Sequence, residues 1–163
     1  MTRYATIAWF SGSSTDALER ACSEAAAPSL ALVDGEDRGS VLVSCFDDEE
    51  SARRDPEPRG AAAVHVYKIE TEWLSPERQA RKARLSRHEG RPLRDVSSAP
   101  LAGLDGLAGL LWLMDRGSGE GVGLLLFESA ESLARGHAFV SDAPPGTAGP
   151  ATSVGLYDVA FIR

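Results

Sequence analysis

"GLLLFESAESLARG", residues 123–136, decides the fold, because in it an apolar strand runs directly into the start of a helix. A looser copy, "LVSCFDDEESARRD", occupies residues 42–55. When the chain is shifted by 81 residues, Val33–Arg54 superposes on Met114–Arg135 without a gap, and six of the twenty-two pairs are identical. Self-similarity at a fixed shift is typical of repeated structural units. The sequence therefore predicts two copies of one small unit.

A second match extends the repeat to the end of each copy. A shift of 90 residues places "AAAVHVYKI" (61–69) on "ATSVGLYDV" (151–159). The nine extra residues fall in the stretch 136–150, whose Pro and Gly residues are typical of a loop. We predict that residues 1–69 form the first repeat and residues 70–163 the second, around one shared core.

Each repeat is expected to follow the order β-α-β-β-α-β. In the first repeat, alternation and turn residues predict a strand at 3–10, a helix at 13–26, a hairpin at 29–46, a helix at 47–54 and a strand at 62–73. In the second, Ser75 and Pro76 are typical of a helix start and predict a helix over 74–90. A hairpin at 106–127, a helix at 128–136 and a strand at 154–162 follow. Because the second repeat shows no separate first strand, the strand at 62–73 is expected to serve both repeats; a short unrecognised strand is the alternative.

Composition narrows the class of protein. The 163 residues carry a net charge of −7 and are 43% hydrophobic, which is enough for a core. An acidic chain does not offer the basic face that nucleic acid and anionic membranes require. No apolar run has the length of a signal peptide core or a membrane span. The two cysteines, Cys22 and Cys45, are interpreted as small buried apolar residues. We expect a cytoplasmic protein with no nucleic-acid partner and no membrane partner.

The segment "GLDGLAGLLWLMDRGSGEGVGLLLFESAESLARG" (103–136) carries a family resemblance. It resembles the hairpin-plus-helix core of the dimeric α/β-barrel superfamily, especially its antibiotic-biosynthesis-monooxygenase-like branch. The shared features are a Gly-rich entry, an apolar strand ending near Asp115, a Gly-containing turn and a strand ending in Phe127 before "ESAESL". The resemblance implies an α+β fold in which two ferredoxin-like βαββαβ repeats face their antiparallel sheets across an internal pseudo-dimeric α/β barrel. A further homodimer stays open.

The same resemblance sets the expected function. The superfamily contains cofactor-independent monooxygenases of aromatic polyketide-type substrates, haem-degrading enzymes, cyclases and proteins without known activity, so the fold alone does not name a reaction. We expect a cofactor-independent monooxygenase-like enzyme with a small apolar or aromatic ligand. A non-catalytic barrel that binds a small ligand and a polyketide cyclase are the alternatives, and the substrate is open.

Candidate site residues are polar or aromatic groups that interrupt apolar strands, since pockets in such folds lie between a sheet and its covering helices. His65 and Tyr67 share one face of a predicted strand, where an imidazole beside a phenol can take a proton from an acidic phenol or enol. We predict that both are catalytic and that Trp9, Trp73 and Tyr157 contact the substrate. The structural alternative for His65 is a histidine with satisfied hydrogen bonds at a sheet edge. The structural alternative for Tyr67 and Tyr157, which the repeat matches, is that they are equivalent packing positions.

Other motifs have simpler interpretations. His137 follows Phe127 at the spacing of the histidine on the second helix of the haem-degrading relatives, but those enzymes also use an Asn, and this sequence has none. His88 is expected to be solvated, and Trp112 is expected to lie in the core. The histidine spacings and the run "DDEE" (47–50) predict no metal site; the run is instead typical of a helix start. The basic segment 78–94 is interpreted as a solvated helix face or as part of a lid over the site.

Overall fold

A computed structural model describes residues 2–12, 15–36, 39–89, 99–101, 103–142 and 150–163. The chain divides into two compact units. Unit 1 consists of Met1–Ile69 together with Tyr157–Arg163, and unit 2 consists of Glu70–Leu156. The C-terminal segment therefore belongs to the same unit as the N-terminal half of the chain.

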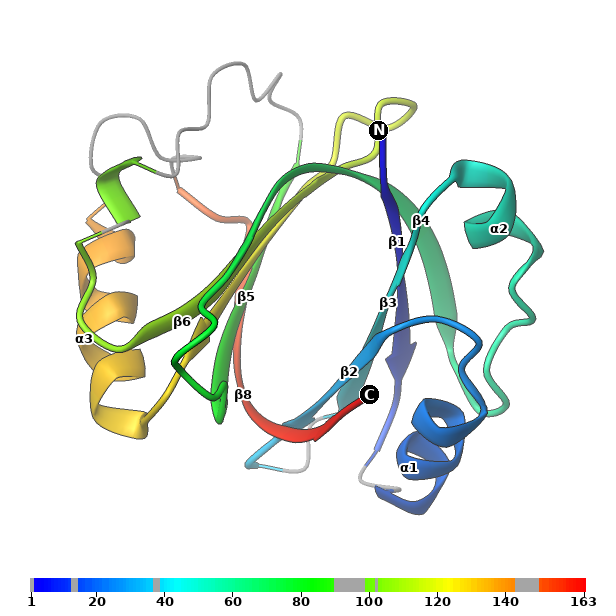
Figure 1. The fold of residues 1–163 in the computed structure, drawn as a ribbon, viewed down its shortest axis with the longest axis horizontal. Helices are drawn as coiled ribbons and strands as arrows, with labels where there is room; N and C mark the ends of the chain where they lie inside the picture. The colour runs from blue at the N-terminus through cyan, green and yellow to red at the C-terminus, as the bar shows by residue number, and fades with distance from the viewer. Residues whose placement is uncertain (1, 13–14, 37–38, 90–98, 102, 143–149) are drawn as a thin grey trace. The chain divides into compact units, whose positions relative to one another are not determined.

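Unit 1 is a ferredoxin-like sheet covered by two helices (Figure 1). Its elements are β1 (Tyr4–Phe10), α1 (Thr15–Glu24), β2 (Ser29–Asp34), β3 (Ser40–Phe46), α2 (Glu49–Arg54) and the first part of β4 (Ala63–Leu74). The antiparallel order is β4-β1-β3-β2, and the end of β8 (Ser153–Ile162) pairs with β2. This order is that of a βαββαβ repeat with one added edge strand.

The core of unit 1 lies between its sheet and α1. Leu18, Ala21 and Cys22 of α1 are buried against a group of sheet residues, namely Ala8, Phe10, Ala31 and Leu42. Burying apolar side chains of this size stabilises a fold by about 1.5–3 kcal/mol each. The helix-covered face of this sheet is thus filled by hydrocarbon.

Unit 2 repeats the strand pattern with one helix (Figure 1). Its elements are β5 (Lys82–His88), the short 3-10 helix η1 (Ala99–Leu101), β6 (Leu107–Met114), β7 (Gly121–Phe127), α3 (Ala130–Ser141) and the first part of β8. The order of hydrogen-bonded strands is β8-β5-β7-β6-β4. Along the whole chain the order is the closed series β1-β3-β2-β8-β5-β7-β6-β4, in which β4 and β8 contribute one part to each unit. The predicted α+β class, with two ferredoxin-like repeats and the strand order of an α/β barrel, is confirmed.

The duplicated stretch builds the same turn twice. Asp48 begins α2 with φ −150° and ψ 163°, and Ser129 begins α3 with φ −151° and ψ 164°. Each side chain accepts a hydrogen bond from the backbone N–H three residues later, that of Ser51 at 2.8 Å and that of Ser132 at 3.1 Å. Such caps satisfy N–H groups that a helix leaves unpaired. The interpretation of "DDEE" as a helix start is therefore confirmed.

One predicted element is wrong: residues 82–88 form strand β5 and not part of a helix. The Ser75 hydroxyl accepts from the N–H of Glu77 at 3.3 Å, so the expected helix cap is a local turn. β5 pairs with β7 along its whole length, from Lys82 opposite Phe127 to His88 opposite Gly121. β5 is the separate first strand of the second repeat, which the sequence did not reveal.

The end of one helix also differs from the sequence prediction. Helix α3 continues to Ser141, five residues beyond the predicted end at Gly136. Residues 90–98 and 102, which contain most of the predicted lid, lie outside the described residues. In the portion of the chain that is described, no helix has the length and apolarity to cross a membrane.

Candidate functional site

Three of the five residues predicted from the sequence, Trp9, His65 and Tyr67, lie on one sheet face of unit 1, opposite the face that α1 covers. Val64 packs into the core beneath α1, and alternation along β4 places His65 and Tyr67 on the opposite face. Register with β1 puts Trp9 on that same face. The structure therefore brings His65, Tyr67 and Trp9 together on the face that α1 does not cover.

These side chains differ in exposure. Tyr67 is 1% exposed, whereas His65 is exposed, and their ring centroids lie 6.3 Å apart. Tyr157 pairs opposite Asp34 at the edge of the same sheet. Trp73 belongs to unit 2 and is 45% exposed. The catalytic role of His65 and Tyr67 stays a prediction.

A comparison of the two first strands points to a second site. β1 and β5 have the same pattern of burial along their seven residues. Each pairs with the third strand of its own repeat. The positions under the helix are Thr6, Ala8 and Phe10 in β1, and the equivalent positions in β5 are Arg84, Ser86 and His88. A mainly apolar surface in unit 1 is thus replaced by ionisable and hydroxyl groups in unit 2.

Arg84 is a buried charge. The residue is 3% exposed, and its Nε–H donates to Nδ1 of His137 on α3 at 3.2 Å. In the segments the structure describes, no carboxylate lies within ion-pair distance of Arg84. Burial lowers the pKa of Arg84 from its ordinary value, because a charged group loses hydration inside the protein. The guanidinium is therefore held in an unfavourable environment.

His88 is also buried, at 6% exposure, which corrects the prediction that it is solvated. Its Nε2 lies 3.1 Å from the hydroxyl of Ser86, which in turn donates to the carbonyl of Gly123 at 3.4 Å. Nδ1 is fully buried and makes no hydrogen bond of regular geometry.

The protonation of His88 is governed by its surroundings. Burial lowers the pKa of His88, and the positive charge of Arg84 lowers it further. A contact with the carbonyl oxygen of Pro150 acts in the opposite direction. Burial, followed by the charge of Arg84, also lowers the pKa of His137. Both imidazoles are therefore neutral at neutral pH, and Arg84 carries the positive charge of the group.

Trp112 forms the aromatic wall of this group. Its ring meets the His88 ring edge to face, with centroids 5.4 Å apart and planes at 66°. Gly123 provides the room, because a Cβ there would lie 3.1 Å from Cζ3 of Trp112 and 2.9 Å from Oγ of Ser86. The equivalent pair in unit 1 is Ala31 and Leu42, so a large and a small residue have exchanged places. Trp112 is buried as predicted, but beside the buried imidazole.

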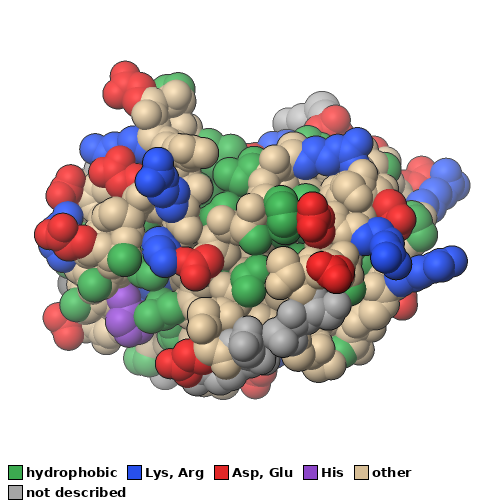
Figure 2. Space-filling model, turned by 90° about the horizontal axis from the view of Figure 1, so that it is seen from below, with side chains coloured by type: hydrophobic (Ala, Val, Ile, Leu, Met, Phe, Trp, Pro, Cys, Tyr) green, Lys and Arg blue, Asp and Glu red, His purple; other side chains and the backbone are tan. Residues whose placement is uncertain are grey.

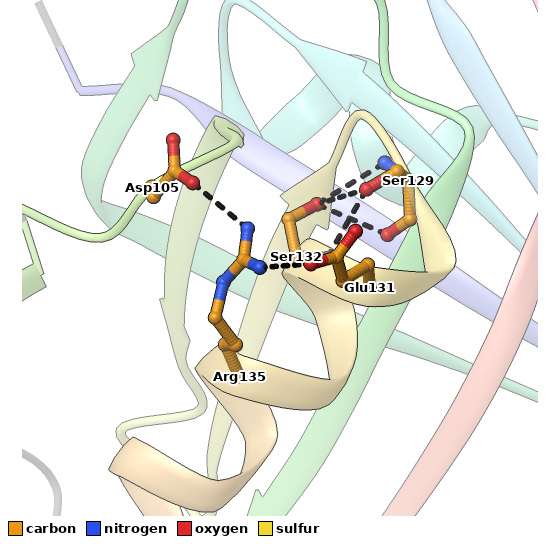
Figure 3. A network of polar contacts seen from close by, with 5 residues as sticks. All are labelled: Asp105, Ser129, Glu131, Ser132 and Arg135. Carbon is orange, nitrogen blue, oxygen red and sulfur yellow. Dashed lines mark hydrogen bonds and ion pairs between the residues drawn. The ribbon is translucent and has the colours of Figure 1, made fainter.

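Helix α3 is fixed over this face by close packing. A Cβ on Gly136 would lie 2.3 Å from Cζ of the fully buried Phe127, so only glycine permits this approach. At the start of the helix, Ser129 and Ser132 form a reciprocal capping box (Figure 3). Arg135 joins Glu131 on the helix to Asp105 before β6, at 2.6 and 2.8 Å (Figure 3). These contacts place His137 beside Arg84.

The arrangement has defined chemical abilities. His88 offers a buried nitrogen that can accept a proton, with its other nitrogen held by Ser86. Arg84 offers a positive charge without an acidic partner among the residues described. Across the ranges that the structure covers, no group of three or more His, Cys, Asp or Glu side chains is placed to hold a metal ion. The group is suited to proton transfer and to binding an anion.

The sequence contains a weak signal for this site. A shift of 78 residues places "YATIAWF" (4–10) on "KARLSRH" (82–88). The two segments have only one identical residue, Ala5 and Ala83, so the alignment becomes visible only when the strands are known.

Comparison with known proteins agrees with the geometry. No family model and no curated protein matches the sequence. A monooxygenase-like protein from Listeria innocua superposes with a TM-score of 0.61 at 8% identity, over 98% of this chain and 95% of its own. A ferredoxin-fold protein from Listeria monocytogenes, related to antibiotic biosynthesis monooxygenases, gives 0.61 at 10% identity over 96% and 95%. The protein has the fold of these monooxygenase-like α/β barrels.

A third protein of the monooxygenase-like fold, an anthrone oxidase-like protein, superposes with a TM-score of 0.59 at 13% identity, over 99% of this chain and 92% of its own. Since each match spans more than nine-tenths of both chains, it includes both repeats. At these identities the likeness establishes the monooxygenase-like fold and leaves the chemistry to the residues of this chain.

Proposed function

We propose that the protein is a cofactor-independent monooxygenase-like enzyme acting on a small aromatic or polyketide-type substrate, with His88 as the general base. One observation carries the proposal: a buried imidazole whose Nδ1 makes no hydrogen bond of regular geometry stands beside Trp112, at the position where the duplicated strand has Phe10. A buried polar atom without a partner costs about 1–3 kcal/mol, so a site that retains one is a candidate for function.

The proposed reaction is the oxidation of an activated methylene by molecular oxygen. His88 removes a proton from an electron-rich phenol or enol, which gives the anion. The anion passes one electron to O2, and the substrate radical combines with superoxide to form a carbon–oxygen bond. His88 returns its proton to the terminal oxygen of the resulting peroxide. Loss of the second proton from that carbon then breaks the O–O bond and releases hydroxide, which takes up this second proton, leaving a ketone and one molecule of water. The substrate supplies all the electrons, so no cofactor is consumed.

The environment of His88 suits the proton transfer. Its lowered pKa keeps the imidazole neutral and able to accept a proton at neutral pH. The Ser86 hydroxyl holds the ring in one orientation, and the ring of Trp112 offers an apolar surface to an aromatic substrate. The name of the anthrone oxidase-like neighbour also supports a substrate of the hydroxyanthrone class.

Oxygen uptake with a panel of hydroxyanthrones tests the proposal. We expect the wild-type protein to consume one O2 per ketone formed, and His88→Gln to lower kcat by about 100-fold or more, the usual contribution of a general base. His65→Gln is the matched variant, because His65 is the base predicted from the sequence. Loss of turnover in His65→Gln with full turnover in His88→Gln would move the reaction to the face of His65, Tyr67 and Trp9.

The same panel separates the two alternatives. Ligand-induced thermal stabilisation without oxygen uptake by any compound would show a non-catalytic ligand-binding protein. A product of unchanged oxygen content would show a cyclase.

A further inference from the structure

Several exposed arginines of the described residues are paired with acids. Arg53 and Arg54 on α2 pair with Glu49 and Glu50 one turn earlier, and Arg87 pairs with Glu120 at 2.9 Å. Figure 2 shows the same mixing over a whole face, where blue and red side chains are interspersed. Arg84 is the contrast, because it is 3% exposed and has no acid beside it in the described part of the chain.

The known contacts of Arg84 involve one of its five hydrogen-bond donors. A guanidinium has five N–H donors in a planar fork, and only Nε–H has a partner among the described residues, Nδ1 of His137.

The neighbours leave the charge uncompensated. His88 and His137 both have a lowered pKa, so at neutral pH neither adds a charge, and neither is an anion. The side chains of Ser86 and His88 share the strand face of Arg84. Neither Nη group of this buried guanidinium has a partner among the described residues. A carboxylate matches it, because a carboxylate is planar, carries one negative charge and accepts two parallel hydrogen bonds from one guanidinium.

We propose that Arg84 is the receptor for a carboxylate carried by an aromatic substrate, and that His137 is a positioning residue that holds the guanidinium through Nε. This inference rests on the proposed function for the place of the site, and it adds the substrate class: aromatic carboxylic acids in place of neutral aromatics. The bound carboxylate supplies the negative charge that the protein lacks at this position, and its ring lies toward Trp112 and His88.

Binding is measured without turnover, by calorimetry under argon at pH 7.5. The probes are 3-hydroxy-2-naphthoate and 3-hydroxy-2-naphthamide, which differ only in the charged group. We expect the acid to bind the wild-type protein at least tenfold more tightly than the amide. Arg84→Gln is expected to remove that preference, and Arg84→Lys, which keeps the charge but loses the fork, is expected to retain part of it. Arg53→Gln, the same change at an exposed ion pair, is expected to leave both affinities unchanged.

Several outcomes would overturn the proposal. They are equal affinity for acid and amide in the wild-type protein, an unchanged acid preference in Arg84→Gln, or no binding of either probe at millimolar concentration. Thermal unfolding of each variant shows whether it is folded; if Arg84→Gln is not, Arg84→Lys decides.

The proposed function is tested separately. His88→Gln is expected to keep the acid preference while losing oxygen uptake. Acid binding that depends on Arg84, without oxygen uptake, would leave the receptor standing and remove the oxygenase. Oxygen uptake that depends on His88, without an acid preference, would support the oxygenase and remove the carboxylate receptor.

Discussion

Replacing His88 by leucine is expected to make the protein more stable. His88→Leu removes the buried Nδ1, whose lack of a regular hydrogen bond costs about 1–3 kcal/mol, and adds apolar burial worth about 1.5 kcal/mol. The losses are the hydrogen bond to Ser86, about 1 kcal/mol, and the edge-to-face contact with Trp112, about 1 kcal/mol. The balance is a gain of about 1.5 kcal/mol in the free energy of unfolding.

Guanidinium chloride unfolding followed by tryptophan fluorescence measures this change. For a chain of 163 residues the gain corresponds to a rise in Tm of about 3–6 °C. The matched control is Phe10→His, which puts an imidazole at the equivalent position of unit 1, among Ala8, Leu18 and Ala31. That change is expected to cost about 3 kcal/mol, since it replaces a core phenyl ring by a smaller polar group.

A loss of more than 1 kcal/mol in His88→Leu would refute the reasoning. It would show that the imidazole is satisfied in the folded protein and serves packing. A gain would mark His88 as a side chain kept at the expense of stability, which is expected of functional groups.

Two further predictions concern pH and packing. In the folded protein both His88 and His137 have a pKa below the ordinary 6.5. Near and below pH 6.5 the unfolded chain therefore binds more protons than the folded one. The contribution of these two histidines to the free energy of unfolding is fully present above pH 6.5 and is lost as the pH drops below it. Denaturation midpoints between pH 5 and 8 measure this, and a slope unchanged in the double variant His88→Leu/His137→Leu would contradict it. Gly136→Ala is expected to cost about 1–3 kcal/mol despite the better helix propensity of alanine, because its Cβ would lie 2.3 Å from Phe127. A thermal melt checks it, and an unchanged Tm would show that α3 can move away from β7 at little cost.

The sequence predicted the duplicated parts well because their signals are local. The hairpins and the capped helices that follow them contain turn residues, caps and apolar strands at matching positions, as at Asp48 and Ser129. Residues 82–88 form a strand instead because they pair with β7, which is far away in the sequence. The Arg and Lys residues of β5 together with Ser75 and Pro76 have the pattern of a helix, and pairing with β7 overrides that preference.

The site was missed for the same reason. Once 82–88 is interpreted as a helix, Arg84 and His88 fall on a charged surface and His88 is expected to meet water. As a strand, the same residues alternate, and every second one faces α3. Burial and the contact between Arg84 and His137, 53 residues apart, are properties of the pairing and are not encoded in either segment alone.

The end of the chain has a consequence for any attempt to separate the repeats. Residues 157–163 pair with β2, so a fragment that stops at Ile69 leaves that edge of the sheet with open N–H and C=O groups. An open edge pairs with the nearest complementary strand, and in a solution of this fragment that strand is β2 of another molecule. In the full chain the complementary strand belongs to the same polypeptide, so folding closes this edge without a second molecule.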